Sequence, residues 1–73
     1  MPHGNIIRIE AGPGFGFIRD DGGMDWFFVA ADVRGGRFDN IWVGERVGFT
    51  PEATPTGPRA ADIHDVQPDY GGR

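Results

Sequence analysis

Two short runs of alternating residues, separated by an acidic, glycine-rich turn, constrain the fold of this chain more than any other feature. The runs are FGFIR (15–19) and DWFFVA (25–30), and DDGG (20–23) lies between them. Side chains of a strand point alternately to its two faces, and aspartate and glycine are typical of tight turns. The segment is therefore predicted to form an antiparallel hairpin.

The same spacing of β-prone runs and turn residues continues through the chain. NIIRIE (5–10) is a predicted first strand rich in β-branched residues, and RVGFT (46–50) and AADIHDV (60–66) are predicted fourth and fifth strands. PEATPTGPR (51–59) holds three of the six prolines and is predicted to be a flexible loop. No window has the 3.6-residue period of a helix, so the chain is expected to be all-β.

A long connector, 31–45, separates the third strand from the fourth. Val33, Ile41 and a short helical turn are expected to cover one end of the core there. Five short strands with a long third connection predict a small antiparallel Greek-key barrel of the OB type. We expect one domain over 4–66 and a flexible C-terminal tail over 67–73.

Alternation divides the bulky residues of the hairpin between the two faces of the sheet. The residues assigned to the inner face are Gly14, Gly16, Ile18, Trp26, Phe28, Val47, Phe49, Ala61 and Ile63. Phe15, Phe17 and Phe27 are left on the outer face, where they form an apolar patch that indicates an interaction site. In an OB barrel this face binds oligonucleotides, and each base stacked on a ring contributes about 1–3 kcal/mol. The alternative is that a partner sheet or a second copy of the chain buries these rings.

Composition restricts the compartment and the class of ligand. The 73 residues include no cysteine, which excludes disulfides and thiolate zinc sites and favours a reducing cytoplasm. No apolar run approaches the roughly 18 residues of a membrane span, and the first ten residues lack the pattern of a signal peptide. The net charge of -4 weighs against a general binder of polyanions.

Four segments of the chain resemble the cold-shock domain family over residues 4–66. GFGFI (14–18) and DWFFV (25–29) are similar to its paired ribonucleoprotein motifs, K-G-F-G-F-I and V-F-V-H-F. FDNIWVGERVGF (38–49) and TGPRAADI (56–63) resemble two downstream segments of the family. The two-part motif with these downstream segments is specific, whereas GFGF alone would be weak.

The resemblance implies an OB barrel that binds single-stranded RNA or DNA by base stacking, as an RNA chaperone or a regulator of transcription or translation. The residues that match the stacking aromatics of the family are Phe15, Phe17, Phe27 and Phe38. The cationic candidates are Arg8, Arg37 and Arg59, for which the alternative is an ordinary solvated charge. The alternative for Phe38 is a loop residue folded over the end of the barrel.

Several departures from the family pattern fall on the binding face. Ile7 and Pro13 stand where the family has lysine, Arg8 where it has tryptophan, Val29 where it has histidine and Ala30 where it has phenylalanine. The stacking surface is thus narrower and less basic, which predicts weak binding with low sequence specificity. The alternative is that these replacements reflect loss of nucleic-acid binding. In that case they favour, together with Trp42, a protein-interaction module.

No other chemistry is indicated. The chain has neither cysteine nor serine, and no nucleophile and base can be paired by spacing, so an enzyme is not expected. Asp20, Asp21 and Asp25 are assigned to the turn, because the spacing of a calcium loop is absent. His3 and His64 have no metal-ligand partner at useful spacing. We therefore expect no metal, cofactor, small-molecule substrate or membrane partner, and a monomer or weak dimer.

Overall fold

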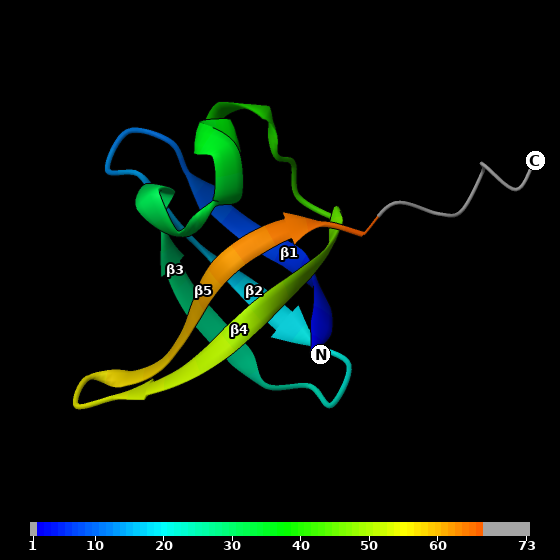
Figure 1. Ribbon diagram of the computed structural model, residues 1–73, viewed down its shortest axis with the longest axis vertical. Coiled ribbons are helices and arrows are strands. Elements are labelled where there is room, and N and C mark those ends of the chain that lie inside the picture. Colours follow the sequence, from blue (N-terminus) through cyan, green and yellow to red (C-terminus); the bar gives the residue numbers. More distant parts are fainter. Residues whose placement is uncertain (1, 67–73) are drawn as a thin grey trace, which may run out of the picture.

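The computed structural model describes residues 2–66, and its first three strands form an antiparallel meander (Figure 1). These strands are β1 (His3–Glu10), β2 (Phe15–Asp20) and β3 (Asp25–Val29). The predicted β2–β3 hairpin is confirmed, with Phe17 opposite Phe27 and Ile18 opposite Trp26. β2 and β3 therefore hold the phenylalanines of the hairpin in the faces expected from alternation.

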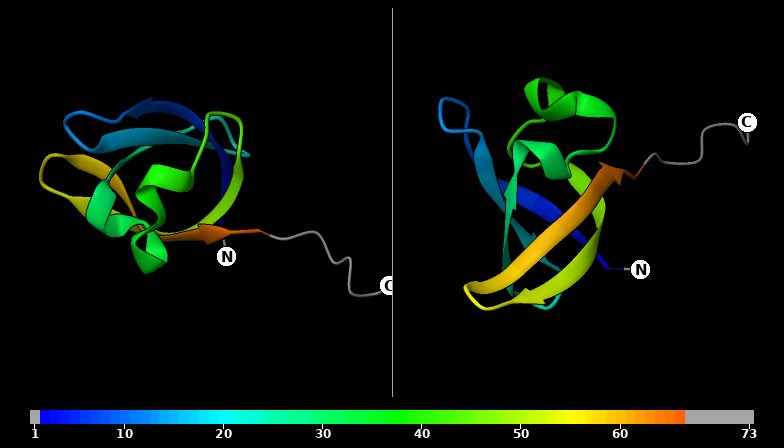
Figure 2. Two further views of the ribbon diagram at one scale, coloured as in Figure 1. Left: turned by 90° about the horizontal axis from the view of Figure 1, so that it is seen from above. Right: turned by 60° about the vertical axis from the view of Figure 1, so that its left-hand side comes forward.

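The connector covers one end of the sheet, as expected. It consists of two short 3-10 helices, η1 (Ala30–Asp32) and η2 (Arg34–Asn40). Val33 between them is buried, and Ile41 after η2 packs against the core. Figure 2 shows both helical turns stacked over one end of the strands.

The last two strands form a hairpin much longer than the sequence predicted. β4 (Arg46–Thr54) and β5 (Gly57–Asp65) continue through the segment 51–59, so the prediction of a flexible loop there is wrong. Pro51 is tolerated in β4 because β1 pairs only with the start of this strand, up to Gly48, and the distal part of β4 is an edge that needs no donor on that side. Pro55 lies in the turn, and Pro58 lies near the start of β5.

The five strands close into a barrel in the order β1-β2-β3-β5-β4. β1 and β4 pair antiparallel, while β3 and β5 meet in parallel at Phe27 and Arg59. An isolated parallel bridge between Val33 and Ile63 continues this seam. The predicted all-β OB-type fold is thereby confirmed, while the domain bounds 4–66 stay a prediction and the tail 67–73 lies outside the described residues.

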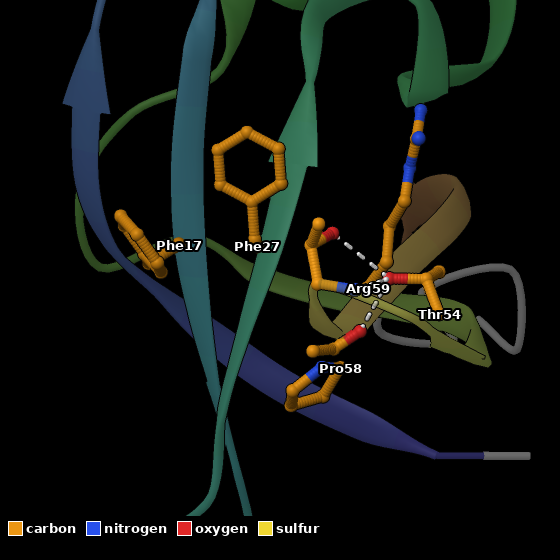
Figure 3. A pocket seen from close by; sticks show the side chains of 7 residues that line it. Phe17, Phe27, Thr54, Pro58 and Arg59 are labelled. Carbon is orange, nitrogen blue, oxygen red and sulfur yellow. Dashed lines mark hydrogen bonds between the residues drawn. The ribbon is translucent and has the colours of Figure 1, made fainter.

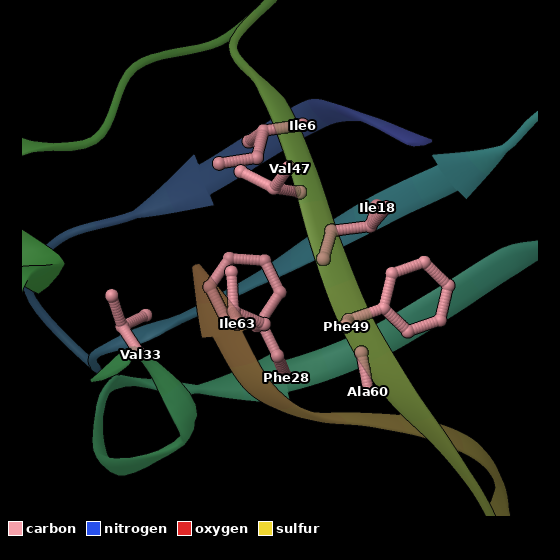
Figure 4. Close-up of a cluster of buried hydrophobic side chains, with 8 residues drawn as sticks. All are labelled: Ile6, Ile18, Phe28, Val33, Val47, Phe49, Ala60 and Ile63. Atoms are coloured by element: carbon pink, nitrogen blue, oxygen red, sulfur yellow. The ribbon is translucent and has the colours of Figure 1, made fainter. Parts of the chain in front are cut away.

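Eight apolar side chains fill the interior (Figure 4). They are Ile6, Ile18, Phe28, Val33, Val47, Phe49, Ala60 and Ile63. Ala60 takes the inward position predicted for Ala61, because β5 carries an extra residue opposite Phe49 and Asp62 has a positive φ of 51°. This bulge breaks the period of two on which the sequence prediction relied.

Trp26 differs from its predicted position inside the barrel. The side chain is only half-buried, with its ring 5.5 Å from that of Phe49. Its indole N–H donates to Asp20 Oδ2 at 2.9 Å. The polar end of an indole needs a hydrogen-bond partner, and Asp20 in the turn provides it, so Trp26 packs against the core from its rim rather than within it. Gly14 likewise belongs to the turn before β2 rather than to the inner face.

Candidate nucleic-acid interface

Three phenylalanines on the outer side of β2 and β3 form a continuous aromatic surface. This aromatic surface consists of Phe15, Phe17 and Phe27, whose ring centroids lie 5.6–6.3 Å apart. The rings meet edge-on or tilted, as aromatic pairs prefer. Each ring is half-buried by its neighbours, so the faces available to a ligand are fewer than three fully exposed rings would offer.

A pocket of about 370 Å³ adjoins the aromatic surface (Figure 3). Phe17 and Phe27 form one wall, and the tip of the β4–β5 hairpin with Arg59 forms the other. The hairpin tip is held by Thr54, whose hydroxyl donates to the Gly57 carbonyl at 2.7 Å and accepts from the Thr56 N–H. The pocket thus places aromatic rings opposite hydroxyl, carbonyl and guanidinium groups.

Arg8 lies beside the aromatic surface, as its predicted role requires. Its guanidinium carbon is 6.0 Å from the centroid of the Phe15 ring, and it pairs with Phe17 in the β1–β2 register. Arg8 Nε also donates to Glu10 at 2.7 Å. The pair is exposed, so water screens it and the guanidinium can exchange Glu10 for another anion at small cost.

Arg59 lines the pocket but is held more firmly. Its guanidinium makes three contacts of 3.1–3.3 Å with the carboxylate of Asp32 in η1. Asp32 is only 13% exposed and also accepts the backbone N–H of Val29. The ion pair therefore fixes Arg59 beside the pocket and neutralises much of its charge.

Phe38 and Arg37 lie in η2 at the end of the barrel, and the ring contacts within the aromatic surface do not include Phe38. Phe38 packs against the core with its ring 6.4 Å from that of Phe28, which is the alternative position considered for it. Arg37 forms an ion pair of 2.9 Å with Asp65 and lies 3.9 Å from Glu45. The structure thus brings together Phe15, Phe17, Phe27, Arg8 and Arg59, and places these two residues elsewhere.

The carboxyl group of Glu45 is buried beneath Arg37. Burial, followed by a hydrogen bond with Asp65, raises the pKa of Glu45. The side chain is 5% exposed, and its Oε1 accepts the N–H of Trp42. This cluster ties the connector to the ends of β4 and β5.

Asp20 organises the β2–β3 turn, in agreement with its predicted structural role. One carboxylate oxygen accepts the N–H groups of Gly22 and Met24, and the other accepts the Trp26 indole. These bonds, the indole first, lower the pKa of Asp20. Asp21 and Asp25 instead form ion pairs with Arg46 and Arg19.

Sequence reasoning missed the hairpin wall of the pocket. The sequence prediction places the residues of this wall in a loop, although the TPTG turn is a usable signal for a hairpin. These residues are Thr54, Thr56, Gly57 and Pro58. Within residues 2–66, no group of three or more histidine and carboxylate side chains is arranged to hold a metal ion. None of the helices in that range is long and apolar enough to cross a membrane.

Comparison with known proteins gives consistent relatives, although no protein-family model matches the chain. The chain is 31% identical over 67 residues to the probable cold shock protein A of Mycolicibacterium smegmatis, covering 90% of this chain and 100% of that protein. It is 41% identical over 61 residues to the cold shock-like protein CspA of Vibrio cholerae, covering 82% of this chain and 87% of that protein.

A solved structure of Drosophila Unr, termed CSD456, matches with a TM-score of 0.74 and 25% identity. The match covers 94% of this chain but only 28% of the length of the Unr chain. Similarity to bacterial cold shock proteins over most of the chain, together with the OB-type barrel and its paired phenylalanine strands, shows that this chain belongs to the cold-shock protein family.

Proposed function

We propose that this protein binds single-stranded RNA or DNA by stacking bases on the aromatic surface. The observation that carries the proposal is the cluster of Phe15, Phe17 and Phe27 beside the pocket. Aromatic rings accept any base, because every base has a π-face. Such a low-specificity binder, acting as a monomer or weak dimer in the cytoplasm, would suit an RNA chaperone or a regulator of transcription or translation.

Binding is expected to be weak and only slightly dependent on salt. Arg8 and Arg59 are the two arginines beside the surface, and both are already paired with carboxylates. If these arginines neutralise one or two phosphates of the strand, the logarithm of the binding constant falls with the logarithm of the salt concentration with a slope of only about -0.7 to -1.4. Stacking therefore supplies most of the affinity, and the chain's net charge of -4 opposes it.

The test is a titration of the protein with a short pyrimidine-rich single strand at low salt, followed by amide chemical shifts. Phe17→Ala should weaken binding by about 1–3 kcal/mol while the variant stays folded. Trp42→Ala is the control, since it removes an exposed aromatic ring from another part of the barrel. If the amides of Phe15, Phe17 and Phe27 do not move at millimolar strand concentration, the proposal fails.

A second candidate function, a protein-interaction module, is favoured by one observation. Trp42 and Val43 are 59% and 60% exposed, next to each other in the loop before β4. Large exposed apolar neighbours of this kind often mark a contact with another protein. Under this reading Trp42→Ala would abolish partner binding and Phe17→Ala would not, so the same two variants separate the candidates.

A further inference from the structure

Two histidines that are distant in sequence lie around one glycine on neighbouring strands. His3 in β1 pairs with Gly48 in β4, and Gly48 pairs with His64 in β5. Val47 and Phe49, on either side of Gly48, are buried in the core, so this row faces outward. The chain has no other histidine, and the strand order therefore gathers all of its imidazoles in one row.

Both imidazoles lean over the bare backbone of Gly48. A Cβ built on this glycine would lie 2.7 Å from His64 Nε2 and 3.4 Å from His3 Cδ2. Because both distances are measured from the same point, His64 Nε2 and His3 Cδ2 are no further apart than the sum of the two, so the rings are close neighbours. Gly48 is buried even though it points outward, because the two rings cover it. A side chain at this position would hold the rings apart.

His64 is oriented so that a ligating nitrogen faces this gap. Its Nδ1 lies 3.0 Å from the carbonyl oxygen of Asp62. A carbonyl only accepts, so in the neutral imidazole this contact places the proton on Nδ1 and leaves the lone pair on Nε2. Metal-ligating histidines commonly donate their second ring N–H to a carbonyl in this way.

Two carboxylates near the imidazoles, those of Asp21 and Asp62, are already paired with arginines. Asp21, whose N–H donates to the His3 carbonyl, forms an ion pair of 2.7 Å with Arg46. Asp62 forms a two-bond ion pair with Arg34 at 2.7 and 2.9 Å. The two imidazoles are thus the candidate ligands, and the carboxylates of Asp21 and Asp62 are already neutralised by their arginine partners.

We propose that His3 and His64 form a two-histidine chelate for a divalent transition-metal ion such as Zn²⁺ or Ni²⁺. Neutral imidazole suits these ions, with N–metal bonds of about 2.0–2.1 Å for zinc, and water would fill the remaining positions. Coordination requires the two side chains to rotate so that one nitrogen of each ring lies within bonding distance of the same ion, which is a change of side-chain rotamer. The site lies over β1, β4 and β5, separate from the aromatic surface on β2 and β3, and is independent of nucleic-acid binding.

The test is a titration of the full chain with Zn²⁺, followed by the imidazole proton resonances and by calorimetry. Both imidazoles should shift along one binding curve, with one ion per chain and the amides of Phe15, Phe17 and Phe27 unmoved. Because the second ligand acts intramolecularly, His3→Gln and His64→Gln should each weaken binding by about tenfold or more. The amide spectrum of each metal-free variant reports whether it is folded, and His3→Gln decides the matter if His64→Gln disturbs β5.

Asp39→Asn is the matched control, because it removes an exposed carboxylate from η2 and should leave the zinc affinity unchanged. The proposal is overturned if the two imidazoles titrate on separate curves or if either single variant keeps the full affinity. A stoichiometry of one ion per two chains would also overturn it, since the metal would then bridge two copies rather than two strands.

Discussion

Replacing Gly16 with alanine tests the packing that separates the aromatic surface from the core. Gly16 lies in β2 between Phe15 and Phe17, and its inner side faces the Phe28 ring. A Cβ there would lie 2.5 Å from the carbonyl oxygen of Arg8 and 2.6 Å from Phe28 Cζ. Both distances are shorter than van der Waals contact, so a strand or the core ring must move.

The expected cost follows from what would have to move. The Arg8 carbonyl is backbone, and Phe28 is fully buried, so neither can rotate away freely. Overpacking of this kind costs about 1–3 kcal/mol, and two rigid neighbours place Gly16→Ala near about 3 kcal/mol. A domain of this size has a total stability of about 4–11 kcal/mol, and each kcal/mol lowers its Tm by about 4–8 °C. The melting temperature should therefore fall by at least about 12 °C.

Urea denaturation followed by circular dichroism measures this loss, with Gly12→Ala as the matched control. A Cβ added to Gly12 would meet no atom within 4 Å beyond its chain neighbours, and this glycine does not have a positive φ. Alanine there should be neutral or stabilise the protein by up to about 1 kcal/mol. If Gly16→Ala loses no more stability than Gly12→Ala, the tight approach of Phe28 to β2 is refuted.

Three further changes have expected outcomes. Burial raises the pKa of Glu45 in the folded protein. Its contribution to folding stability is therefore full below the ordinary glutamate pKa of about 4.3 and is lost as pH rises through the raised value. Glu45→Gln should increase the urea midpoint at pH 7, and a decrease would contradict the burial cost. Hydrogen bonds, that of the Trp26 indole first, lower the pKa of Asp20, so its contribution to folding stability is present at neutral pH and is lost as pH falls below about 4. Asp20→Asn should make the decrease of folding stability with falling pH less steep, and an unchanged pH dependence would argue against the turn network. Thr54→Val removes the hydroxyl that donates to Gly57 and should cost about 1 kcal/mol in thermal unfolding; an unchanged Tm would show that the hairpin tip does not need this bond.

The local parts of the fold could be predicted from the sequence, because a strand period of two is readable in a short run of residues. The faces of Phe15, Phe17 and Phe27 followed from that period and the acidic turn. The position of Ala60 did not follow, because the bulge at Asp62 has no local signal such as glycine. Local pattern thus predicts a strand but not the point where its register shifts.

Tertiary packing decided the features of the site that sequence reasoning missed. Phe38 matches a stacking position by resemblance, yet the packing of η2 over the barrel end turns its ring toward Phe28. The three prolines of segment 51–59 predict a loop, although the edge part of β4 accommodates Pro51, and Pro55 and Pro58 lie in the turn and near the start of β5. The approach of His3 to His64 depends on strand order, which a linear spacing rule cannot reveal.

The parallel seam between β3 and β5 has a dynamic consequence. Phe27 on one side of the seam and Arg59 on the other are the register partners of the two strands, and both also line the pocket. A barrel opens most readily where the fewest backbone bonds join neighbouring strands. A base held between the two walls would therefore brace the weakest join of the barrel, and amide hydrogen exchange in β3 and β5 should slow on binding before exchange in β1 and β2 responds.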